Sequence, residues 1–317
     1  MSTLRLLLTG VKSYLPSGTE YTMSTRRVDP AYGYAVWLRH CASLAKHGIR
    51  GPFPSVVELG PGNSMATGVS AILSGSSRYT GLDVLQHMAH DKNLSVLDEV
   101  AELFRSRQPI PGDAVYPNLR PLLANYEFPA EALGSQGLAA TTDADRLAAL
   151  RRDIEVIGRG GIGGEALRYY CPWTADSVAP ESADLVITQA VLQEIPHGAR
   201  RSPLRETIMA IARWLRPGGI GTHQVDMGLY GLEPWNAHWT WSDVTWTLVR
   251  GRRSNFVNRE PLSTYLHLMR ECGLSVVAVD ALEETGVPEE RLAPRFKVLD
   301  ETDRRTRSAL VILRKQG

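Results

Sequence analysis

The stretch Val56-Val57-Glu58-Leu59-Gly60-Pro61-Gly62-Asn63 decides the fold predicted for this chain. An apolar run of strand length contains an acidic residue near its end, and glycine then occupies two alternate positions. Such glycines allow a tight turn and let the backbone pass close beneath a ligand. A second apolar run, Tyr79 to Leu82, is followed by Asp83, 25 positions after Glu58. In adenosine-binding folds, the carboxylate that receives the ribose hydroxyl groups ends the second strand, roughly 20 residues after the glycine turn. The two runs therefore predict one adenosine site.

A nicotinamide-binding turn has a different pattern, because it needs a third glycine three positions after the second. Met65 occupies that position here. The carboxylate of Glu58 would also repel a diphosphate, so the turn favours a ligand that carries positive charge. The alternative is that Pro61 and Gly62 only turn the chain after a buried strand.

With Glu58 two positions before the first glycine, the turn resembles motif I of the class I S-adenosylmethionine-dependent methyltransferases. The resemblance runs from about Tyr32 to the carboxyl terminus and is weakest after Asp83. It implies that S-adenosyl-L-methionine is the cofactor, with its methionine end facing Glu58 and its ribose held by Asp83. Gly60 and Gly62 would form the turn beneath it. This ligand is cationic at its sulfur and at its amino group, which agrees with the charge of the turn.

Short apolar runs alternate with helical stretches after Val56, which predicts an α/β fold with a doubly wound, mostly parallel, Rossmann-like sheet. The sequence Leu215-Arg216-Pro217-Gly218-Gly219 predicts a helix end and a left-handed turn before a strand that begins at Ile220. The paired runs near the carboxyl end resemble the sixth and seventh strands of the methyltransferase fold, of which the last is antiparallel. The seven expected strands cover residues 56–59, 79–82, 167–171, 184–188, 220 onward, 274–280 and 308–313.

Two regions lie outside this alternation. Residues 1–53 precede the first strand and predict a helical lid segment, which leaves 54–317 as the methyltransferase domain. Residues from about 85 to 165 exceed what a simple crossover needs, so they predict an insertion with helices at 94–104 and 147–157, although the apolar end of the second segment also allows a strand. Because loops at the carboxyl edge of such sheets carry specificity, we interpret the insertion as a substrate cap.

A second glycine run, Gly158 to Gly163, fits the dinucleotide pattern G-x-G-x-x-G letter for letter. Only residues 164–170 remain for a helix before Pro172, which is too short for the helix whose amino end should hold a diphosphate. We predict a surface loop here. An NAD-dependent oxidoreductase built on this run is the less favoured alternative.

The resemblance implies further cofactor contacts. Residues 31–41, AYGYAVWLRHC, are similar to the first helix of a bacterial methyltransferase group associated with sugar and polysaccharide biosynthesis. That likeness implies that Tyr34 and Arg39 contact the methionyl tail, Arg39 by pairing with its carboxylate. Asp176 matches the family position that accepts a hydrogen bond from the adenine amino group. A surface turn is the alternative for Asp176.

Gln189 and Gln193 fall at the carboxyl end of the fourth strand, where the resemblance places the sulfonium and the methyl acceptor. Members of the family often carry an acidic residue and histidine at the positions of Gln193 and Glu194. Because the chain departs from the family here, we assign no catalytic base to the fourth strand. The departure also keeps open a protein that binds the cofactor without transferring a methyl group.

Methyl transfer is an in-line displacement at carbon, so it requires alignment, a dry site and, for a hydroxyl acceptor, a base. His223 is the first candidate base, because it lies on the predicted fifth strand with Asp226 nearby. His238 is the second. A buried histidine bonded to backbone is the alternative for His223. The reaction requires no metal, and none is predicted.

Four of the seven tryptophans gather in one short segment: Trp235, Trp239, Trp241 and Trp246. Trp235 and Trp239 have the spacing of one helical face, and they are the candidates for an apolar wall beside the substrate. Core packing or a subunit contact, such as that of a homodimer, is the alternative.

Composition excludes several classes of function. The 317 residues carry 35 Lys and Arg against 34 Asp and Glu, so no global field directs the chain to nucleic acid or to an anionic membrane. Three widely spaced cysteines suit a reducing, cytoplasmic location. The apolar stretch Leu4 to Leu8 is too short for a signal sequence or a membrane span.

The sequence therefore predicts a cytoplasmic S-adenosylmethionine-dependent methyltransferase that acts on a small molecule, a sugar or a specialised metabolite, by O-methylation. Two alternatives retain the same cofactor. One is a non-methylating S-adenosylmethionine-binding protein, and the other is an enzyme that uses S-adenosylmethionine itself as substrate in cyclisation or alkyl transfer.

Overall fold

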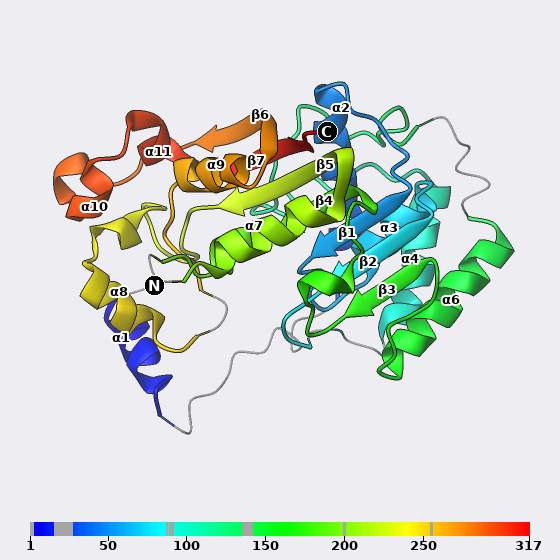
Figure 1. Ribbon diagram of the computed structural model, residues 1–317, viewed down its shortest axis with the longest axis horizontal. Coiled ribbons are helices and arrows are strands. Elements are labelled where there is room, and N and C mark those ends of the chain that lie inside the picture. Colours follow the sequence, from blue (N-terminus) through cyan, green and yellow to red (C-terminus); the bar gives the residue numbers. More distant parts are fainter. Residues whose placement is uncertain are drawn as a thin grey trace.

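The computed structural model describes residues 3–15, 28–86, 88, 92–134, 142–198, 201–253 and 256–317. Its strands form one seven-stranded sheet in the order β3-β2-β1-β4-β5-β7-β6 (Figure 1). The pairings among the first five strands are parallel, whereas β7 is antiparallel to both β5 and β6. The predicted fold class is confirmed. Parts of the expected lid (1–2 and 16–27) and of the insertion (87, 89–91 and 135–141) lie outside the described residues.

The elements follow the predicted alternation of strands and helices. The strands are β1 Ser55–Leu59, β2 Arg78–Leu82, β3 Leu167–Tyr170, β4 Ala183–Gln189, β5 Leu215–Asp226, β6 Leu274–Glu283 and β7 Thr306–Lys315. The α-helices are α1 Thr3–Lys12, α2 Pro30–Lys46, α3 Ala66–Leu73, α4 Asn93–Arg105, α6 Ala144–Gly158, α7 Pro203–Trp214, α8 Asp243–Arg250, α9 Leu262–Glu271, α10 Pro294–Lys297 and α11 Glu301–Arg305. Short 3₁₀ turns occur at η3 Ala175–Ser177, η4 Leu192–Glu194, η5 Ala237–Thr240 and η6 Glu289–Arg291.

The start of β5 differs from the prediction. The strand begins at Leu215, directly after α7, rather than at Ile220. Leu215 pairs with Ala183 and the next pair joins Ile220 to Leu185, so the residues between them bulge out of the ladder. Gly218 in this bulge has a φ of +75°, which is the left-handed conformation predicted for the junction.

Helices cover both faces of the sheet (Figure 1). One apolar cluster contains side chains of α2, α3, α4 and α6 together with Val56 and Leu185. The other contains side chains of α7 and α9 together with Val57 and Val186. Because neighbouring residues of a strand point to opposite faces, this alternation assigns each strand residue to one of the two layers. Glu58, two positions after Val56, therefore faces the α2 layer.

Helix α2 belongs to that core layer. Asp29 caps it by accepting hydrogen bonds from the amides of Ala31 and Tyr32, and Pro30 follows at the first helical position. Gly33 allows a close approach to α3, because a Cβ at Gly33 would lie 2.4 Å from the Cβ of Ala66. The carboxyl half of α2 then continues over β4 and β5, where His40 contacts Thr222.

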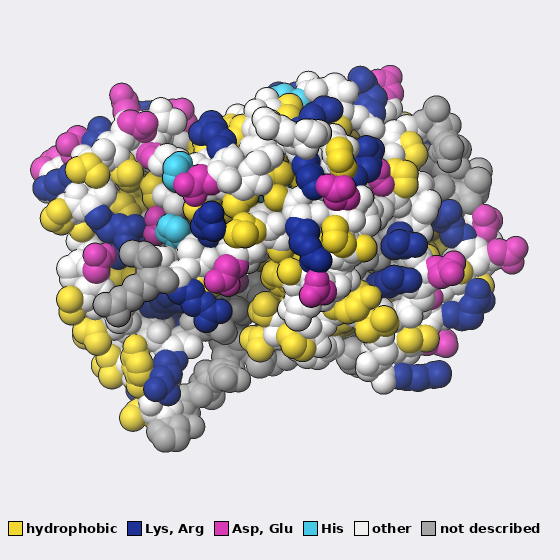
Figure 2. Space-filling model, viewed as in Figure 1, with side chains coloured by type: hydrophobic (Ala, Val, Ile, Leu, Met, Phe, Trp, Pro, Cys, Tyr) yellow, Lys and Arg dark blue, Asp and Glu magenta, His cyan; other side chains and the backbone are white. Residues whose placement is uncertain are grey.

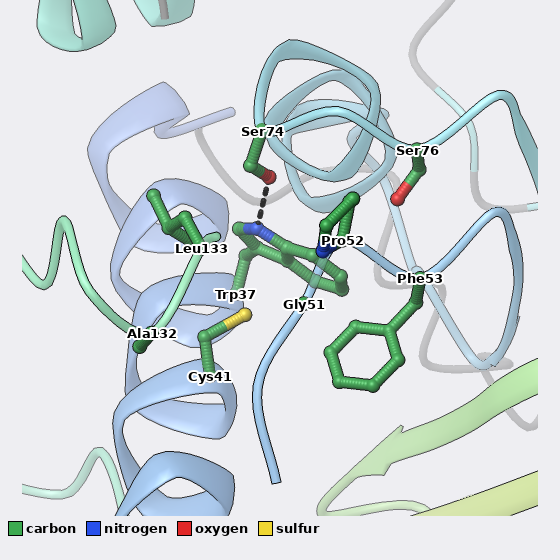
Figure 3. Close-up of a pocket in the computed structure, with 9 residues that line it drawn as sticks. All are labelled: Trp37, Cys41, Gly51, Pro52, Phe53, Ser74, Ser76, Ala132 and Leu133. Carbon is green, nitrogen blue, oxygen red and sulfur yellow. Dashed lines mark hydrogen bonds between the residues drawn. The ribbon is translucent and has the colours of Figure 1, made fainter. Parts of the chain in front are cut away.

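Residues 106–134 of the insertion run along α2. In the middle of this segment, the carbonyl of Arg120 accepts a hydrogen bond from Gln189, the last residue of β4. Near the end of the segment, Ala132 and Leu133 pack beside Trp37 in the closed seam of Figure 3, where the indole of Trp37 donates a hydrogen bond to Ser74 at 2.6 Å. The space within this seam is too narrow for a water molecule. The seam therefore joins the insertion to α2 and α3 and does not hold a ligand.

The first helix lies apart from α2. Leu6 of α1 is buried with Trp246 and Val249 of α8 and with Phe256 in a third, smaller apolar cluster. Side chains of both charges are interspersed over the face of the molecule in Figure 2. In the parts of the chain described here, no helix is long and apolar enough to cross a membrane.

Candidate functional site

Glu58 and Asp83 lie at the carboxyl ends of β1 and β2. β1 also pairs with β4, so the order of strands reverses at this place, which is where open α/β sheets bind ligands. The amide of Gly60 donates to the carbonyl of Leu82 at 2.8 Å, and the amide of Gly62 donates to the Asp83 carboxylate at 3.2 Å. These bonds fasten the glycine turn to the end of β2. The structure thus brings both acids to one turn.

The two glycines of the turn have left-handed backbones. Gly60 has a φ of +74° and Gly62 a φ of +73°, conformations that other residues adopt only with strain. Val191, in the loop after β4, lies directly against Gly60, and a Cβ at Gly60 would be 2.4 Å from its Cγ2. The loops after β1 and β4 therefore meet at the switch point.

We expect Gly60→Ala to lower the free energy of unfolding by about 2 kcal/mol or more, because it combines left-handed strain with the clash against Val191. Gly218→Ala is the matched control, since Gly218 has nearly the same φ of +75° and nothing within 4 Å of the added methyl group. Gly218→Ala should lower the free energy of unfolding by about 1–2 kcal/mol, because it adds only the left-handed strain. Chemical denaturation of both variants checks this, and equal losses would contradict the role assigned to Val191.

Burial sets the charge state of the two acids. Glu58 is 2% exposed and Asp83 is 6% exposed. Burial raises the pKa of Glu58 to about 8, although a hydrogen bond from the hydroxyl of Tyr79 opposes the shift, and the nearby Asp83 raises it further. Burial likewise raises the pKa of Asp83 to about 7, against hydrogen bonds from Tyr169 and from the amide of Gly62. In the ligand-free protein both carboxyls therefore hold their protons at higher pH than usual.

Within the described parts of the chain, the hydrogen-bond partners of Glu58 and Asp83 are neutral groups. These partners are tyrosine and threonine hydroxyls and a backbone amide. None of the ion pairs among the described residues includes either acid. Since a buried carboxylate is stabilised by an opposite charge, a cation brought to this turn would gain energy from ionising Glu58 and Asp83. Chemically, the arrangement is suited to a ligand with positive charge and hydroxyl groups.

The turn is closed in this structure. A surface recess of about 340 Å³ lies instead at the amino ends of β1 and β2, beside Pro54, Ser55, Ser77, Arg78 and Glu165. Val191, in the loop after β4, packs directly on Gly60 of the turn. Ala190 begins this loop with a φ of +54°, a strained conformation for alanine.

Gln189 is held by protein groups. Its amide oxygen lies 3.0 Å from Nε2 of His40, and its amide nitrogen donates to the carbonyl of Arg120 at 3.1 Å. The other ring nitrogen of His40 lies 3.0 Å from the hydroxyl of Thr222. Burial lowers the pKa of His40 to about 4, so its ring is neutral. This network ties α2 and the insertion to the carboxyl ends of β4 and β5.

Tyr34 and Arg39 contact the insertion. The hydroxyl of Tyr34 donates to the carbonyl of Gln108 at 2.6 Å. Both terminal nitrogens of the Arg39 guanidinium donate to the insertion, and the acceptors are the carbonyls of Pro111, Leu119 and Pro121 and the carboxylate of Asp113. A bond from Arg39 to a ligand carboxylate would have to break these contacts. In the structure Arg39 holds the insertion against α2, and its pairing with the methionyl carboxylate stays a prediction from the resemblance.

Asp176 does not join the buried pair. It lies in η3, its side chain is 84% exposed, and it pairs with Arg213 of α7 at 2.8 Å. The surface turn, which was the alternative interpretation, describes its position in the structure. Its contact with adenine stays a prediction from the resemblance.

The structure does not bring either predicted base to the acid pair. Thr222 meets His40 on the α2 side, so His223, the next residue, points to the other face of the sheet, where its Nδ1 lies 3.1 Å from the hydroxyl of Thr188. Burial lowers the pKa of His223 and of His238 to about 3. Such weakly basic rings are poor proton acceptors. The alternation of side chains along β5 thus places His223 on the opposite face of the sheet from Glu58, and its role as a base stays a prediction.

The predicted substrate residues are also enclosed. Trp235 and Trp239 are fully buried and meet edge to face at 5.2 Å, and Trp239 stacks on Phe296 at 4.8 Å. They are part of the core beside α9, as the alternative interpretation stated. Gln193 is buried in η4, and its amide oxygen has no hydrogen-bond partner among the described residues. Among the described residues, the amide oxygen of Gln193 and the indole nitrogen of Trp239 are thus both buried polar atoms without a hydrogen-bond partner, whereas the indole of Trp235 donates to the carbonyl of Glu284.

Three neighbours of the site were missed from the sequence: Tyr79, Tyr169 and His40. Tyr79 could have been found, because it lies two residues before Gly81, which pairs with Glu58. Tyr169 depends on the register of β3 against β2, which pairs it with Gly81. His40 is separated from Gln189 by 149 positions, and no local pattern indicates that contact.

The chain was compared with known families, curated proteins and solved structures. The sequence matches no protein-family model and no curated protein. Among solved structures, an S-adenosylmethionine-dependent methyltransferase from Methanosarcina mazei is 12% identical over 86% of this chain and 97% of its own, with a TM-score of 0.43. One from Mesorhizobium loti is 14% identical over 90% and 100%, with a TM-score of 0.40. A chain of the complex between the Haloferax volcanii Trm112 methyltransferase activator and a putative methyltransferase is 16% identical over 92% and 100%, with a TM-score of 0.42. At such low values, the function has to be argued from the site itself.

Proposed function

We propose that this protein binds S-adenosyl-L-methionine at the turn between Glu58 and Asp83 and transfers its methyl group to a small molecule. The observation that carries the proposal is the pair of buried carboxylates, which converge on a glycine turn at the switch point of the sheet and have no basic partner among the residues that the structure describes. An amino-acid cation with an adenosine group satisfies both requirements of such a site. It supplies positive charge for the carboxylates and ribose hydroxyls for Asp83.

The residues present fit this cofactor. Gly60 and Gly62 keep the turn free of side chains, Glu58 supplies negative charge for the methionyl amino group and sulfur, and Asp83 accepts from the ribose. When bound, the cofactor supplies an electrophilic methyl group on a cationic sulfur. The protein's own part is to exclude water and to align the acceptor. Oxygen of a sugar or specialised metabolite remains the proposed acceptor, and the balanced global charge argues against nucleic acid.

Binding and turnover test the proposal separately. Calorimetry with S-adenosylmethionine and with S-adenosylhomocysteine should give a binding signal for both. Incubation with methyl-labelled cofactor and fractionated small-molecule extract should then yield a labelled product together with S-adenosylhomocysteine. Absence of binding to either compound refutes the proposal. Binding with no transfer to any fraction favours a non-methylating binding protein, and products derived from the cofactor alone favour cyclisation or alkyl transfer.

We expect the affinity for S-adenosylmethionine to rise with pH. Between pH 6 and 7.5 the free protein holds the proton of Glu58, whose pKa is about 8, and the cationic ligand favours the ionised form. Binding then releases a proton, and affinity increases by up to about tenfold per pH unit. Glu58→Gln should weaken binding and flatten this dependence. Calorimetry at several pH values checks it, and an equally steep profile in the variant would count against Glu58.

The stability of the ligand-free protein should depend on pH in the opposite direction. A carboxyl whose pKa is raised by folding stabilises the fold fully below its unfolded pKa, and this contribution is lost as pH rises through the folded pKa. For Glu58 and Asp83 the window extends from about pH 4 to about pH 8. Ligand-free stability should therefore fall over the same range in which binding strengthens.

The oxidoreductase alternative lacks structural support. The run Gly158 to Gly163 follows α6 and leads into β3, so the order is helix, glycines, strand. A dinucleotide turn requires strand, glycines, helix. Gly163 also forms an isolated bridge with Arg168, which places the run at the amino end of β3, away from the switch point.

A further inference from the structure

Helices α1 and α8 form one unit with an exposed apolar face. Gly10 permits their close contact, because a Cβ at this position would lie 2.1 Å from the carbonyl oxygen of Leu248. The hydroxyl of Ser13 accepts a hydrogen bond from the amide of Arg252 at 2.8 Å, which fastens the end of α1 to the end of α8. We call this unit the α1/α8 pair; it comprises residues 3–15 and 243–253.

The outer face of the α1/α8 pair is aliphatic. Along α1 the exposed side chains follow helical spacing, while Leu6 on the other side of the helix is buried. Figure 2 shows hydrophobic side chains along this outer edge of the molecule, where Figure 1 places α1 and α8. The face consists of Leu4, Leu8, Val11, Val244 and Leu248, which are between 43% and 73% exposed. A grouped aliphatic face of this kind requires an apolar partner.

Basic side chains outnumber acidic ones in the α1/α8 pair. Arg5, Lys12 and Arg252 are exposed, Arg250 and Arg253 are half-buried with Arg253 over the ring of Phe256, and the one acidic residue is Asp243. Asp243 is already paired with Arg259 at 2.6 Å. The whole chain has a formal charge of only +1, so the positive charge at this face is a local feature. Long basic side chains beside an aliphatic face are the composition of a helix that lies in a membrane interface.

From this composition we propose that the α1/α8 pair docks on an anionic lipid surface, with its aliphatic side chains in the boundary of the acyl chains and its basic side chains at the headgroups. Charge selects this occupant over a second copy of the chain. A two-fold contact through the same face would bring the basic residues of one copy against those of the other. Headgroup phosphates instead neutralise them. The docking requires no helix to span the bilayer.

Sedimentation with lipid vesicles tests the proposal. The full chain should sediment with vesicles that contain phosphatidylglycerol, should bind little to pure phosphatidylcholine, and should be released by salt, since screening weakens the electrostatic part. Leu8→Glu and Leu248→Glu should each lower the partition coefficient by about tenfold or more, because each replaces buried aliphatic area with a charge in the interface. Both side chains are exposed, so the fold tolerates these changes.

Val298→Glu is the matched control, because Val298 is an exposed aliphatic residue beside α10, outside the α1/α8 pair. It should leave vesicle binding unchanged. Glu58→Gln should also bind vesicles normally, so a failure of the cofactor proposal does not affect this test. Sedimentation velocity without lipid adds a further check: a dimer that Leu8→Glu dissociates would identify the face as a self-contact and overturn the proposal. Failure to bind anionic vesicles at low salt would overturn it as well.

Discussion

Asp83→Asn should weaken the binding of S-adenosylmethionine and at the same time raise the stability of the ligand-free protein. We expect the variant to lose at least about 100-fold in affinity for S-adenosylmethionine, because the ionised carboxylate makes charge-assisted bonds that an amide cannot replace. The ligand-free variant should be more stable than the parent at pH 8, by on the order of 2 kcal/mol. The reason is that burial raises the pKa of Asp83 to about 7, and the neutral amide removes the cost of its ionisation.

Calorimetry with S-adenosylmethionine and urea unfolding without ligand measure the two effects. Asp184→Asn is the matched control, because Asp184 lies at the opposite end of the sheet, where it accepts from the amide of Ser55 and pairs with Arg216. It should lower stability and leave binding unchanged. If Asp83→Asn binds the ligand as tightly as the parent does, the site proposed at the switch point is refuted.

Arg39→Ala should be the most destabilising of the changes considered, at about 3–5 kcal/mol. The guanidinium is fully buried and satisfies three carbonyls of the insertion, those of Pro111, Leu119 and Pro121. Its removal leaves buried acceptors without donors, and it also removes the contact of Arg39 with the ring of Tyr126 at 4.9 Å. Urea unfolding of the ligand-free protein measures the loss.

The control for this change is Arg213→Ala. Arg213 also pairs with an aspartate and donates to a carbonyl, but its side chain is 39% exposed and its partner Asp176 is 84% exposed. Exposed pairs contribute about 0–1 kcal/mol, so this variant should be nearly neutral. If Arg39→Ala is equally mild and instead abolishes cofactor binding, Arg39 has the ligand contact that the resemblance implied.

The sheet was predictable because its signals are local. Short apolar runs separated by helical stretches identified the first five strands, the family resemblance added the sixth and seventh, and the glycines after β1 marked the turn at the switch point. The start of β5 was misplaced by five residues. The helix end and the glycine turn were correctly placed there, but the pairing of Leu215 with Ala183, which extends the strand backward, is a contact between distant segments.

The roles of single polar residues were less predictable. Arg39 and His223 have side chains suited to binding and to proton transfer, yet α2 directs Arg39 into the insertion and the alternation of β5 directs His223 to the opposite layer. Burial then lowers the pKa of His223 to about 3. A residue type indicates what chemistry is available, whereas packing decides which groups meet.

By itself the sequence determined the order of strands and helices and the acidic glycine turn, because hydrophobic period and backbone freedom are properties of neighbouring residues. Only the tertiary structure decided that Glu58 and Asp83 are buried together and that Arg39 holds the insertion. It also decided that α1 and α8 share one basic, aliphatic face. These three outcomes depend on desolvation and on contacts between segments far apart in the chain. A local sequence pattern encodes neither the desolvation nor the contacts.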